Sequence, residues 1–358
     1  MRYTVSIGTF FGIPLRVHFT FPLILVVFGA QAWIGGDWRD AVWAVLLVLV
    51  IFICVVLHEF GHCLQVRRYG IPVRDIVLLP IGGMARAERI PERPRHEIVV
   101  AISGPVVNFA LAGIFLAAIW IRGKPIDLEN DFLSSLLAIN LVLGTFNLIP
   151  AFPMDGGRIL RGILAVRFPY LTATRYAKAV GQIIALVFIV VGFVDHSFIM
   201  LPLIAVFIYF GAISEENMVR VRVMLEGRCV GDFVPADQRA VRVDGSIEGA
   251  FAMIDPSAWT ARRPGGRGLP AVFAATDAAG TALGVVSADD IVAAVQDGRG
   301  DEPVSRIVRC DFPVLSADMP AVQAYYRLRA ERLPYAGVLD SGRLVGLVFT
   351  DSMLQIPS

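Results

Sequence analysis

The stretch Leu57-His58-Glu59-Phe60-Gly61-His62 lies inside an apolar segment that runs from about residue 41 to 66. On a helix, two histidines four residues apart project from one face, where both can reach a single metal ion. The glutamate between them is close enough to take a proton from a metal-bound water. An ionisable group in mid-bilayer costs about 2.5–3.5 kcal/mol, so a span with three of them has to face a bundle interior. The pattern predicts a metal site within a membrane rather than a polar cluster that only joins helices.

Apolar runs of this kind recur through the first part of the chain. Because such runs can cross a ~30 Å hydrocarbon core as helices, we expect about six transmembrane helices. They are placed at about 17–35, 41–66, 98–121, 133–150, 179–194 and 197–214. The first could instead be a secretory signal ending near Gly29-Ala30-Gln31-Ala32, but its apolar part begins only after some sixteen residues, which favours an uncleaved anchor.

The composition agrees with a membrane protein that carries a soluble tail. Of 358 residues, 56% are hydrophobic and 18% charged, and the mean hydropathy is +0.66. The net charge of +1 shows no basic excess, so no nucleic-acid partner is expected. Arginine and lysine gather after the second, fourth and sixth expected spans, which places those loops and both termini in the cytosol. We therefore expect an integral protein of the cell membrane whose surroundings are the lipid bilayer.

A third metal ligand is needed, because zinc in a catalytic site has three protein ligands and two histidines leave it one short. The best candidate is Asp155, which follows Pro150 and Pro153 at the end of the fourth expected span. The prolines break the helix there, and non-helical backbone at membrane depth is tolerated only where it lines a cavity. The other interpretation is that Asp155 is only the N-cap of a helix beginning near Gly157.

Topology supports the pairing of the two motifs. The second and fourth spans both run from outside to inside. His62 lies shortly before the cytosolic Arg67, and Asp155 lies shortly before the cytosolic Arg158. The histidines and the aspartate should therefore reach a similar depth on the same side.

The membrane half resembles the site-2 protease family of intramembrane zinc metalloproteases, over about residues 10–215. Four motifs in order carry the resemblance: His58-Glu59-Phe60-Gly61-His62, Ile81-Gly82-Gly83-Met84-Ala85, Ser103-Gly104-Pro105-Val106-Val107-Asn108, and the segment from Asn147 through Pro150 and Pro153 to Asp155-Gly156. With no PDZ insertion and with C-terminal CBS-like repeats, the chain is most similar to the branch of sporulation pro-sigma-factor processing proteases and archaeal relatives.

The resemblance implies a site and an activity. His58, His62 and Asp155 would hold one Zn²⁺, with Glu59 as the catalytic base. Asn147, Pro150 and Pro153 would shape the loop beside the substrate. Asn108 and Asn140 could each support a ligand or join helices; support is favoured for Asn108, which lies inside a family motif, and helix joining for Asn140. The expected activity is cleavage of a membrane-tethered regulatory protein within or near its transmembrane segment, close to the cytosolic face. The expected partner is such a substrate, for example a transcription regulator or a sigma or anti-sigma factor.

Two further features of the membrane half have open roles. Residues 71–79 and 84–90 flank the turn signal Pro80-Ile81-Gly82-Gly83, which predicts a hairpin. It is either a plain connector or an edge to which an extended substrate pairs by strand addition. His18 is either an interfacial group or part of the cavity lining, and it is not expected to be a ligand.

The tail changes to short strands alternating with helices, and the pattern repeats. Residues 283–291 match residues 345–353, about 62 residues apart. We expect a membrane-embedded core over 1–218 and a cytosolic α/β pair over 226–358, with repeat one about 228–297 and repeat two about 303–356. The first copy carries an insertion around 257–268 that reads as a loop.

This tandem resembles a pair of CBS domains, which bind adenosyl nucleotides. The resemblance places Ser287 and Asp290 at the nucleotide-contacting positions, whereas the second copy has Phe349 and Ser352 there. An adenine nucleotide would then bind at one site or none. The alternative is a homodimerisation or substrate-docking module without a ligand.

Two other classes of function compete with a protease. Buried His, Glu and Asp could mark the ion path of a CBS-gated transporter or channel. A catalytically silent membrane scaffold is the other, although every catalytic position of the family is intact. One tightly held zinc, and activity lost on Glu59→Gln, would distinguish the protease.

Overall fold

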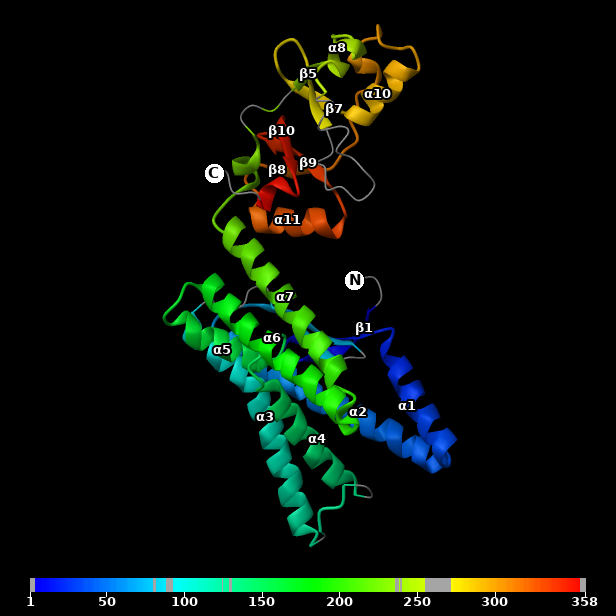
Figure 1. Ribbon diagram of the computed structural model, residues 1–358, viewed down its shortest axis with the longest axis vertical. Helices are drawn as coiled ribbons and strands as arrows, with labels where there is room; N and C mark the ends of the chain where they lie inside the picture. Colours follow the sequence, from blue (N-terminus) through cyan, green and yellow to red (C-terminus); the bar gives the residue numbers. More distant parts are fainter. Residues whose placement is uncertain are drawn as a thin grey trace. The chain divides into compact units, whose positions relative to one another are not determined.

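The structure is a computed structural model that describes residues 4–79, 82–87, 93–123, 125–128, 131–235, 238, 240–254 and 272–354. The chain divides into two compact units, Met1–Asn217 and Met218–Ser358, and each is described by itself. Figure 1 shows the course of the chain, with helices α1 to α7 in the order of the sequence.

The first unit is mainly helical. Its helices are α1 (Phe21–Gly35), α2 (Trp38–Arg68), α3 (Pro94–Ile121), α4 (Phe132–Asn147), α5 (Asp155–Ala165), α6 (Tyr170–Val194) and α7 (Leu201–Leu225). Of the described helices, α2, α3, α6 and α7 are long and apolar enough to cross a membrane, while α1 and α4 are shorter apolar helices. The predicted polytopic α-helical architecture is confirmed, with the number of spanning helices approximate.

Helices α2 and α3 approach each other closely at a small residue. A Cβ atom at Gly61 would lie 2.7 Å from the carbonyl oxygen of Ser103, so only glycine permits this separation of the two backbones. Pro105 lies inside α3 two residues further on. The contact fixes α2 against the part of α3 that carries the Ser103-Gly104-Pro105 motif.

Helix α6 begins nine residues earlier than the apolar pattern predicts, at Tyr170 rather than about 179. Its first turns contain charged residues that are paired within the protein. Arg175 Nε and Lys178 Nζ lie 3.3 and 2.6 Å from the carboxylate of Glu216 in α7. Hydropathy alone misses these turns because the charges are neutralised by another helix.

A four-stranded sheet adjoins α2. It contains β1 (Thr4–Phe10), β2 (Ile13–His18), β3 (Val73–Leu79) and β4 (Gly82–Ala87) in the order β1-β2-β3-β4, with β2 parallel to β3. The predicted hairpin is present as β3–β4, and its Pro80-Ile81 turn and residues 88–90 lie outside the described part.

The N-terminal hairpin β1–β2 was not predicted. The first span is predicted to begin at about residue 17, whereas His18 ends β2 and α1 starts at Phe21. Ile13 of β2 and Ile76 of β3 are fully buried in one apolar cluster with residues of α2. These strands contribute to a core, so their apolar character does not indicate a span.

The second unit contains two copies of one α/β arrangement. The first has β5 (Ala240–Arg242), α8 (Ile247–Phe251), β6 (Val272–Thr276), β7 (Ala282–Ser287) and α10 (Ala288–Gln296); the second has β8 (Val314–Ser316), α11 (Ala321–Ala330), β9 (Tyr335–Asp340), β10 (Arg343–Phe349) and the 3-10 turn η4 (Ser352–Leu354). In each copy the first strand pairs in parallel with the second, which pairs antiparallel with the third. The predicted tandem α/β tail is confirmed, and the insertion at 257–268 lies outside the described residues.

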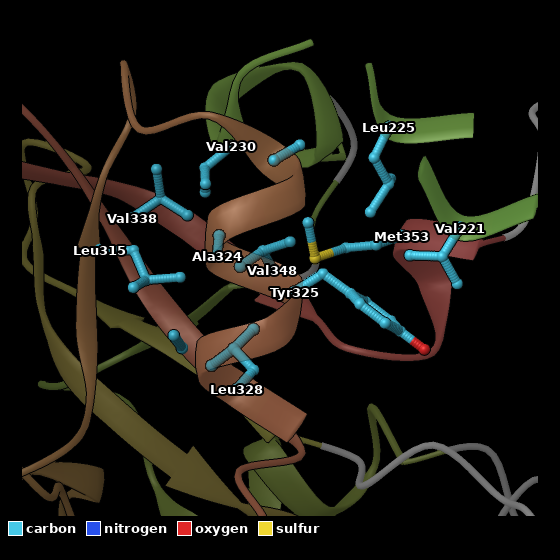
Figure 2. Close-up of a cluster of buried hydrophobic side chains, with 12 residues drawn as sticks. Val221, Leu225, Val230, Leu315, Ala324, Tyr325, Leu328, Val338, Val348 and Met353 are labelled. Atoms are coloured by element: carbon cyan, nitrogen blue, oxygen red, sulfur yellow. The ribbon is translucent and has the colours of Figure 1, made fainter. Parts of the chain in front are cut away.

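The core of the second copy includes residues that precede the first copy in sequence. Figure 2 shows Val221 and Leu225 from the end of α7, together with Val230, beside Tyr325 and Leu328 of α11. The turn η2 (Val230–Phe233) is tied to this copy by a hydrogen bond from Val230 N to Met319 O of 3.0 Å. Residues 228–233, which the repeat pattern assigned to the first copy, therefore pack with the second.

Candidate metal centre

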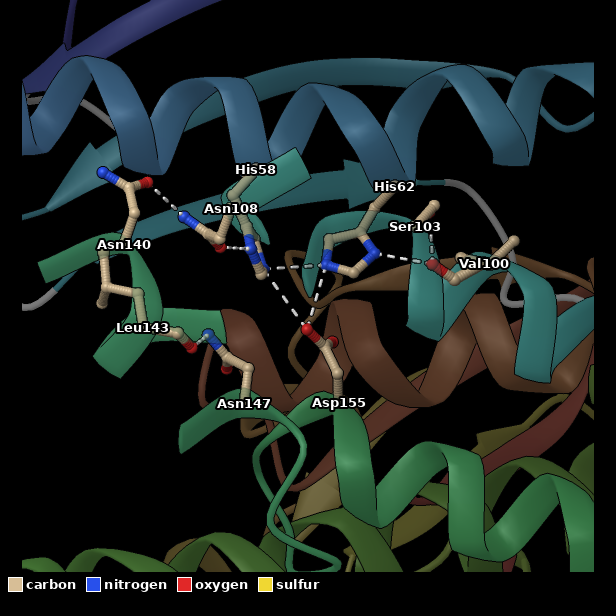
Figure 3. A network of polar contacts seen from close by, with 9 residues as sticks. All are labelled: His58, His62, Val100, Ser103, Asn108, Asn140, Leu143, Asn147 and Asp155. Carbon is tan, nitrogen blue, oxygen red and sulfur yellow. Dashed lines mark hydrogen bonds and ion pairs between the residues drawn. The ribbon is translucent and has the colours of Figure 1, made fainter. Parts of the chain in front are cut away.

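Three side chains from two distant segments meet at one point in the membrane unit. His58 and His62 project from α2, and Asp155 is the first residue of α5 (Figure 3). The Oδ2 atom of Asp155 lies 3.3 Å from His58 Nε2 and 3.2 Å from His62 Nε2. The two Nε2 atoms are 3.1 Å apart. The two motifs expected at a similar depth therefore lie together in the structure.

Hydrogen bonds orient both imidazole rings. His62 Nδ1 donates to the carbonyl oxygen of Val100 at 2.7 Å. His58 Nδ1 lies 2.5 Å from Asn108 Oδ1. Because a carbonyl oxygen can only accept, each ring carries its proton on Nδ1, and the lone pair of Nε2 faces Asp155.

Asn140 completes this support. Asn108 Nδ2 donates to Asn140 Oδ1 at 2.9 Å, and Asn140 Nδ2 donates to the Leu136 carbonyl at 2.9 Å. The amide of Asn108 is therefore held with its oxygen toward His58. Asn140 thus joins α4 to α3, the role expected for it, and through Asn108 it also supports the ring of His58.

The three atoms suit a zinc ion. Two imidazole lone pairs and a carboxylate oxygen repel one another unless a cation lies between them, and buried Asp155 Oδ2 has no hydrogen bond. Ligands about 2.0–2.2 Å from a tetrahedral zinc stand about 3.3–3.5 Å apart, close to the observed separations. Among the described residues, these three form the metal-capable cluster. Three protein ligands are typical of catalytic zinc, which keeps a fourth position open.

A tight turn before α5 positions Asp155. A Cβ at Gly156 would lie 2.2 Å from the carbonyl oxygen of Ile149, and a Cβ at Gly157 would lie 2.6 Å from Phe152 N. Met154 is the N-cap of α5, so Asp155 is not the capping residue. As the first residue of the helix, its carboxylate is stabilised by the positive end of the helix dipole.

The other predicted residues of the loop are not among the three clustered residues. Asn147 Nδ2 donates to the Leu143 carbonyl of its own helix at 3.0 Å. Pro150 is exposed, and Pro153 contacts α7, where a Cβ at Gly211 would lie 2.6 Å from its Cδ. His18 Nδ1 lies 2.7 Å from Thr20 Oγ1 and is outside the cluster.

Strand β4 passes close to Glu59. A Cβ at Gly83 would lie 2.7 Å from Glu59 Cγ and 3.4 Å from Val55 Cγ1. Glu59 is on the same helix as both histidines, and β4 is the outer strand of the described sheet. The Glu59 side chain is therefore packed against β4.

The predicted nucleotide residues contact each other. Ser287 is the N-cap of α10 and donates from Oγ to Asp290 Oδ2 at 2.7 Å. Asp290 Oδ1 also pairs with Arg309 Nη2 at 2.6 Å, and the Asp290 carboxylate raises the pKa of this arginine. These contacts account for both residues as parts of a helix terminus.

Comparison with known proteins identifies relatives of this chain. The model of peptidase family M50 matches residues 46–126 and 127–191. The zinc metalloprotease MJ0392 of Methanocaldococcus jannaschii is 38% identical over 253 residues, which cover 69% of this chain and 71% of that protein. Among solved structures, a site-2 protease from the same organism matches 60% of this chain and 95% of its own, with TM-score 0.46 and 38% identity. The CBS domain of a bacterial CNNM/CorC family Mg²⁺ transporter matches 39% of this chain and 81% of its own, with TM-score 0.31 and 18% identity.

A membrane-embedded zinc metalloprotease is thus the class that the sequence, the helices and the relatives define. The chain belongs to peptidase family M50, the site-2 protease type. It is an integral membrane protein, and the enzyme class leaves the transporter and scaffold interpretations without support.

Proposed function

We propose that His58, His62 and Asp155 bind one zinc ion and that Glu59 is the general base of an intramembrane endopeptidase. The convergence of two Nε2 atoms and a buried carboxylate oxygen within 3.1–3.3 Å of one another carries the proposal. When bound, the metal would act as a Lewis acid that lowers the pKa of water and polarises the scissile carbonyl.

The residues around the site then have separate tasks. Glu59 accepts the proton of the attacking water and returns it to the leaving amine, because it lies on the ligand helix without being one of the three clustered residues. Asn108 and the Val100 carbonyl hold the imidazoles with Nε2 toward the ion. Asn147, Pro150 and Pro153 shape the loop along which the substrate lies.

The substrate is a membrane-tethered regulatory protein that is unwound and paired with β4. A helical peptide hides its carbonyls in hydrogen bonds, so cleavage requires an extended segment. The outer edge of β4 offers main-chain groups for strand addition, and Gly83 brings that strand against Glu59. A substrate strand bound there would lie beside the proposed base.

The cut occurs near the cytosolic end of the substrate helix. The arginine-rich loops after the second and fourth expected spans adjoin both metal-binding motifs, and they orient the protein in the cell membrane with cytosolic termini. Sequencing of cleavage products tests this proposal. A cut in the outer half of the span would contradict the orientation.

The tail regulates the core, and the effector is an adenine nucleotide that binds near Ser287 and Asp290. The tail also forms a homodimer. Residues 215–225, which lead from the membrane unit to the tail, are the helical end of α7. The same helix carries Glu215 in the membrane unit and Leu225 in the core of the second copy. A helical connection transmits a displacement that a flexible linker would absorb.

The decisive experiment compares Glu59→Gln with His58→Ala, His62→Ala and Asp155→Ala in purified full-length protein. Glu59→Gln should retain one zinc and lose cleavage, whereas each ligand variant should lose both. Mass spectrometry of membrane-tethered proteins in cells with wild type or Glu59→Gln would identify the substrate. Full zinc occupancy in Asp155→Ala would remove this residue from the site, and turnover by Glu59→Gln would refute the mechanism.

A further inference from the structure

Arg161 is a charged side chain with no exposed surface in the membrane unit. It lies on α5, six residues after Asp155. Nε and Nη2 lie 2.7 and 2.5 Å from Glu97 Oε1 in α3, and Nη1 lies 2.8 Å from Glu215 Oε1 in α7. One guanidinium thus joins three helices, and the proposed chemistry does not use it.

Two aromatic rings lie close to the guanidinium. Its central carbon lies 5.0 Å from the ring centroid of Phe152 and 4.9 Å from that of Tyr170. Phe152 is fully buried in the loop that leads into Asp155. Arg161 therefore contacts the loop that precedes Asp155, although Arg161 itself lies on the helix that begins with Asp155.

The energetics of this cluster favour a role in positioning. Burying ions costs more than their attraction commonly returns, so an apolar side chain of similar size would stabilise the fold as well or better. An arginine differs from such a residue in the fixed directions of its five donors. The carboxylates of α3 and α7 define where the guanidinium lies, and the guanidinium defines where Phe152 and α5 lie.

We propose that Arg161 is a positioning residue for the metal site: it holds the 152–155 turn so that Asp155 Oδ2 stays within reach of both histidines. The inference rests on the proposed function in one respect, namely that Asp155 is a ligand. Loss of the clamp should let the turn relax and raise the rate at which zinc leaves.

The chain provides a matched control. Arg175 of α6 also pairs with a carboxylate of α7, its Nε lying 3.3 Å from Glu216 Oε1. Its side chain is 54% exposed, and Lys178 pairs with the same carboxylate. Arg175→Lys thus changes an arginine–glutamate contact of α7 away from the 152–155 turn.

The experiment uses full-length protein loaded with zinc in detergent micelles, below the unfolding temperature of every variant. The rate of zinc transfer to a chromogenic chelator is measured for wild type, Arg161→Lys and Arg175→Lys. Lysine keeps the buried charge but cannot reach both carboxylates and both rings. We expect zinc release about 10–100-fold faster in Arg161→Lys and unchanged in Arg175→Lys. The visible spectrum of the Co²⁺-substituted protein, which reports ligand geometry, should shift in Arg161→Lys alone.

A lower unfolding temperature of Arg161→Lys with wild-type zinc release and a wild-type Co²⁺ spectrum would show a purely structural residue and overturn the proposal. If Arg161→Lys does not fold, Phe152→Leu tests the same clamp with every charge in place, and about two- to thirtyfold faster release is expected. Unchanged release in Phe152→Leu would then overturn it. Asp155→Ala separates the two proposals, because retained zinc there refutes the ligand assignment, whereas lost zinc there with unchanged Arg161→Lys refutes only the clamp.

Discussion

Gly104 of α3 lies directly against Nε2 of His62. A Cβ at this position would overlap with His62 Nε2 and lie 2.6 Å from His58 Nε2, far inside van der Waals contact. The glycine of the Ser103-Gly104-Pro105 motif thus makes room for the two imidazole nitrogens. This relation explains why a motif that contributes no side chain to the cluster belongs to the site.

Gly104→Ala should abolish zinc binding while both histidines remain. The added methyl group would occupy the position of the imidazole nitrogens, and moving α3 away from α2 to make room for it would cost the close packing of Gly61 against the Ser103 carbonyl. Metal analysis of the purified variant would measure this. Gly113→Ala, on the same helix, is the control, since a Cβ at Gly113 would have no neighbouring atom within 4 Å. Full zinc content in Gly104→Ala would show that the helices separate more easily than the packing indicates.

Much of this site follows from the sequence, and the reasons are physical. His58 and His62 share a helix face by spacing alone, and the position of Asp155 follows from matched depth. The contacts of Val100 and Gly104 depend on how α3 lies against α2, which no local pattern encodes.

The fold was predictable in the same uneven way. Long apolar runs predict spanning helices because bilayer thickness fixes their length. The hairpin β1–β2 was missed because β2 gains stability by pairing with β3, a strand more than fifty residues away in the sequence. Residues 228–233 were assigned to the wrong copy because sequence order does not show which sheet a segment joins.

Asn108→Ala should weaken zinc binding about 10–100-fold without eliminating it. The variant removes the oxygen that accepts from His58 Nδ1, so the ring can rotate and Nε2 no longer points at the ion. Competition with a chelator of known affinity measures the change. Asn147→Ala is the matched control for zinc affinity, because the Asn147 amide donates to the Leu143 carbonyl of its own helix and not to a histidine. Equal affinities in the two variants would contradict the role of Asn108.

Gly83→Ala should lower kcat while leaving the zinc content unchanged. The methyl group would lie 2.7 Å from Glu59 Cγ and displace the proposed base, whereas the ligands are not touched. Turnover of a transmembrane peptide substrate and metal analysis of the same preparation test both parts. Gly35→Ala, with nothing within 4 Å of its Cβ, controls for the substitution itself. A loss of zinc in Gly83→Ala would mean that β4 supports the ligands rather than Glu59.

Millimolar ATP should change the cleavage rate of the full-length enzyme, and this effect should depend on Asp290. A ligand alters the rate only if it binds two arrangements of the protein with different affinity, so we expect about a 5–150-fold effect. Asp290→Ala should remove the ATP dependence without altering zinc content. Asp297→Ala is the control, because this exposed carboxylate of the same copy also pairs with an arginine, Arg299. Absence of ATP binding at millimolar concentration would leave the tail as a docking or dimerisation module.

Breaking α7 should uncouple the tail even when ATP binds. Asn217 and Met218 are exposed on this helix at the boundary of the two units, so glycine at both positions removes little packing. Each glycine costs about 1 kcal/mol of helix stability, which permits a hinge between Glu215, paired with Arg161, and Leu225 in the core of the second copy. The Asn217→Gly/Met218→Gly variant should bind zinc and ATP as the wild type does, but its cleavage rate should no longer respond to ATP. Alanine at the same two positions keeps the helix and should keep the response. An unchanged ATP response in the glycine variant would show that the signal does not pass along α7.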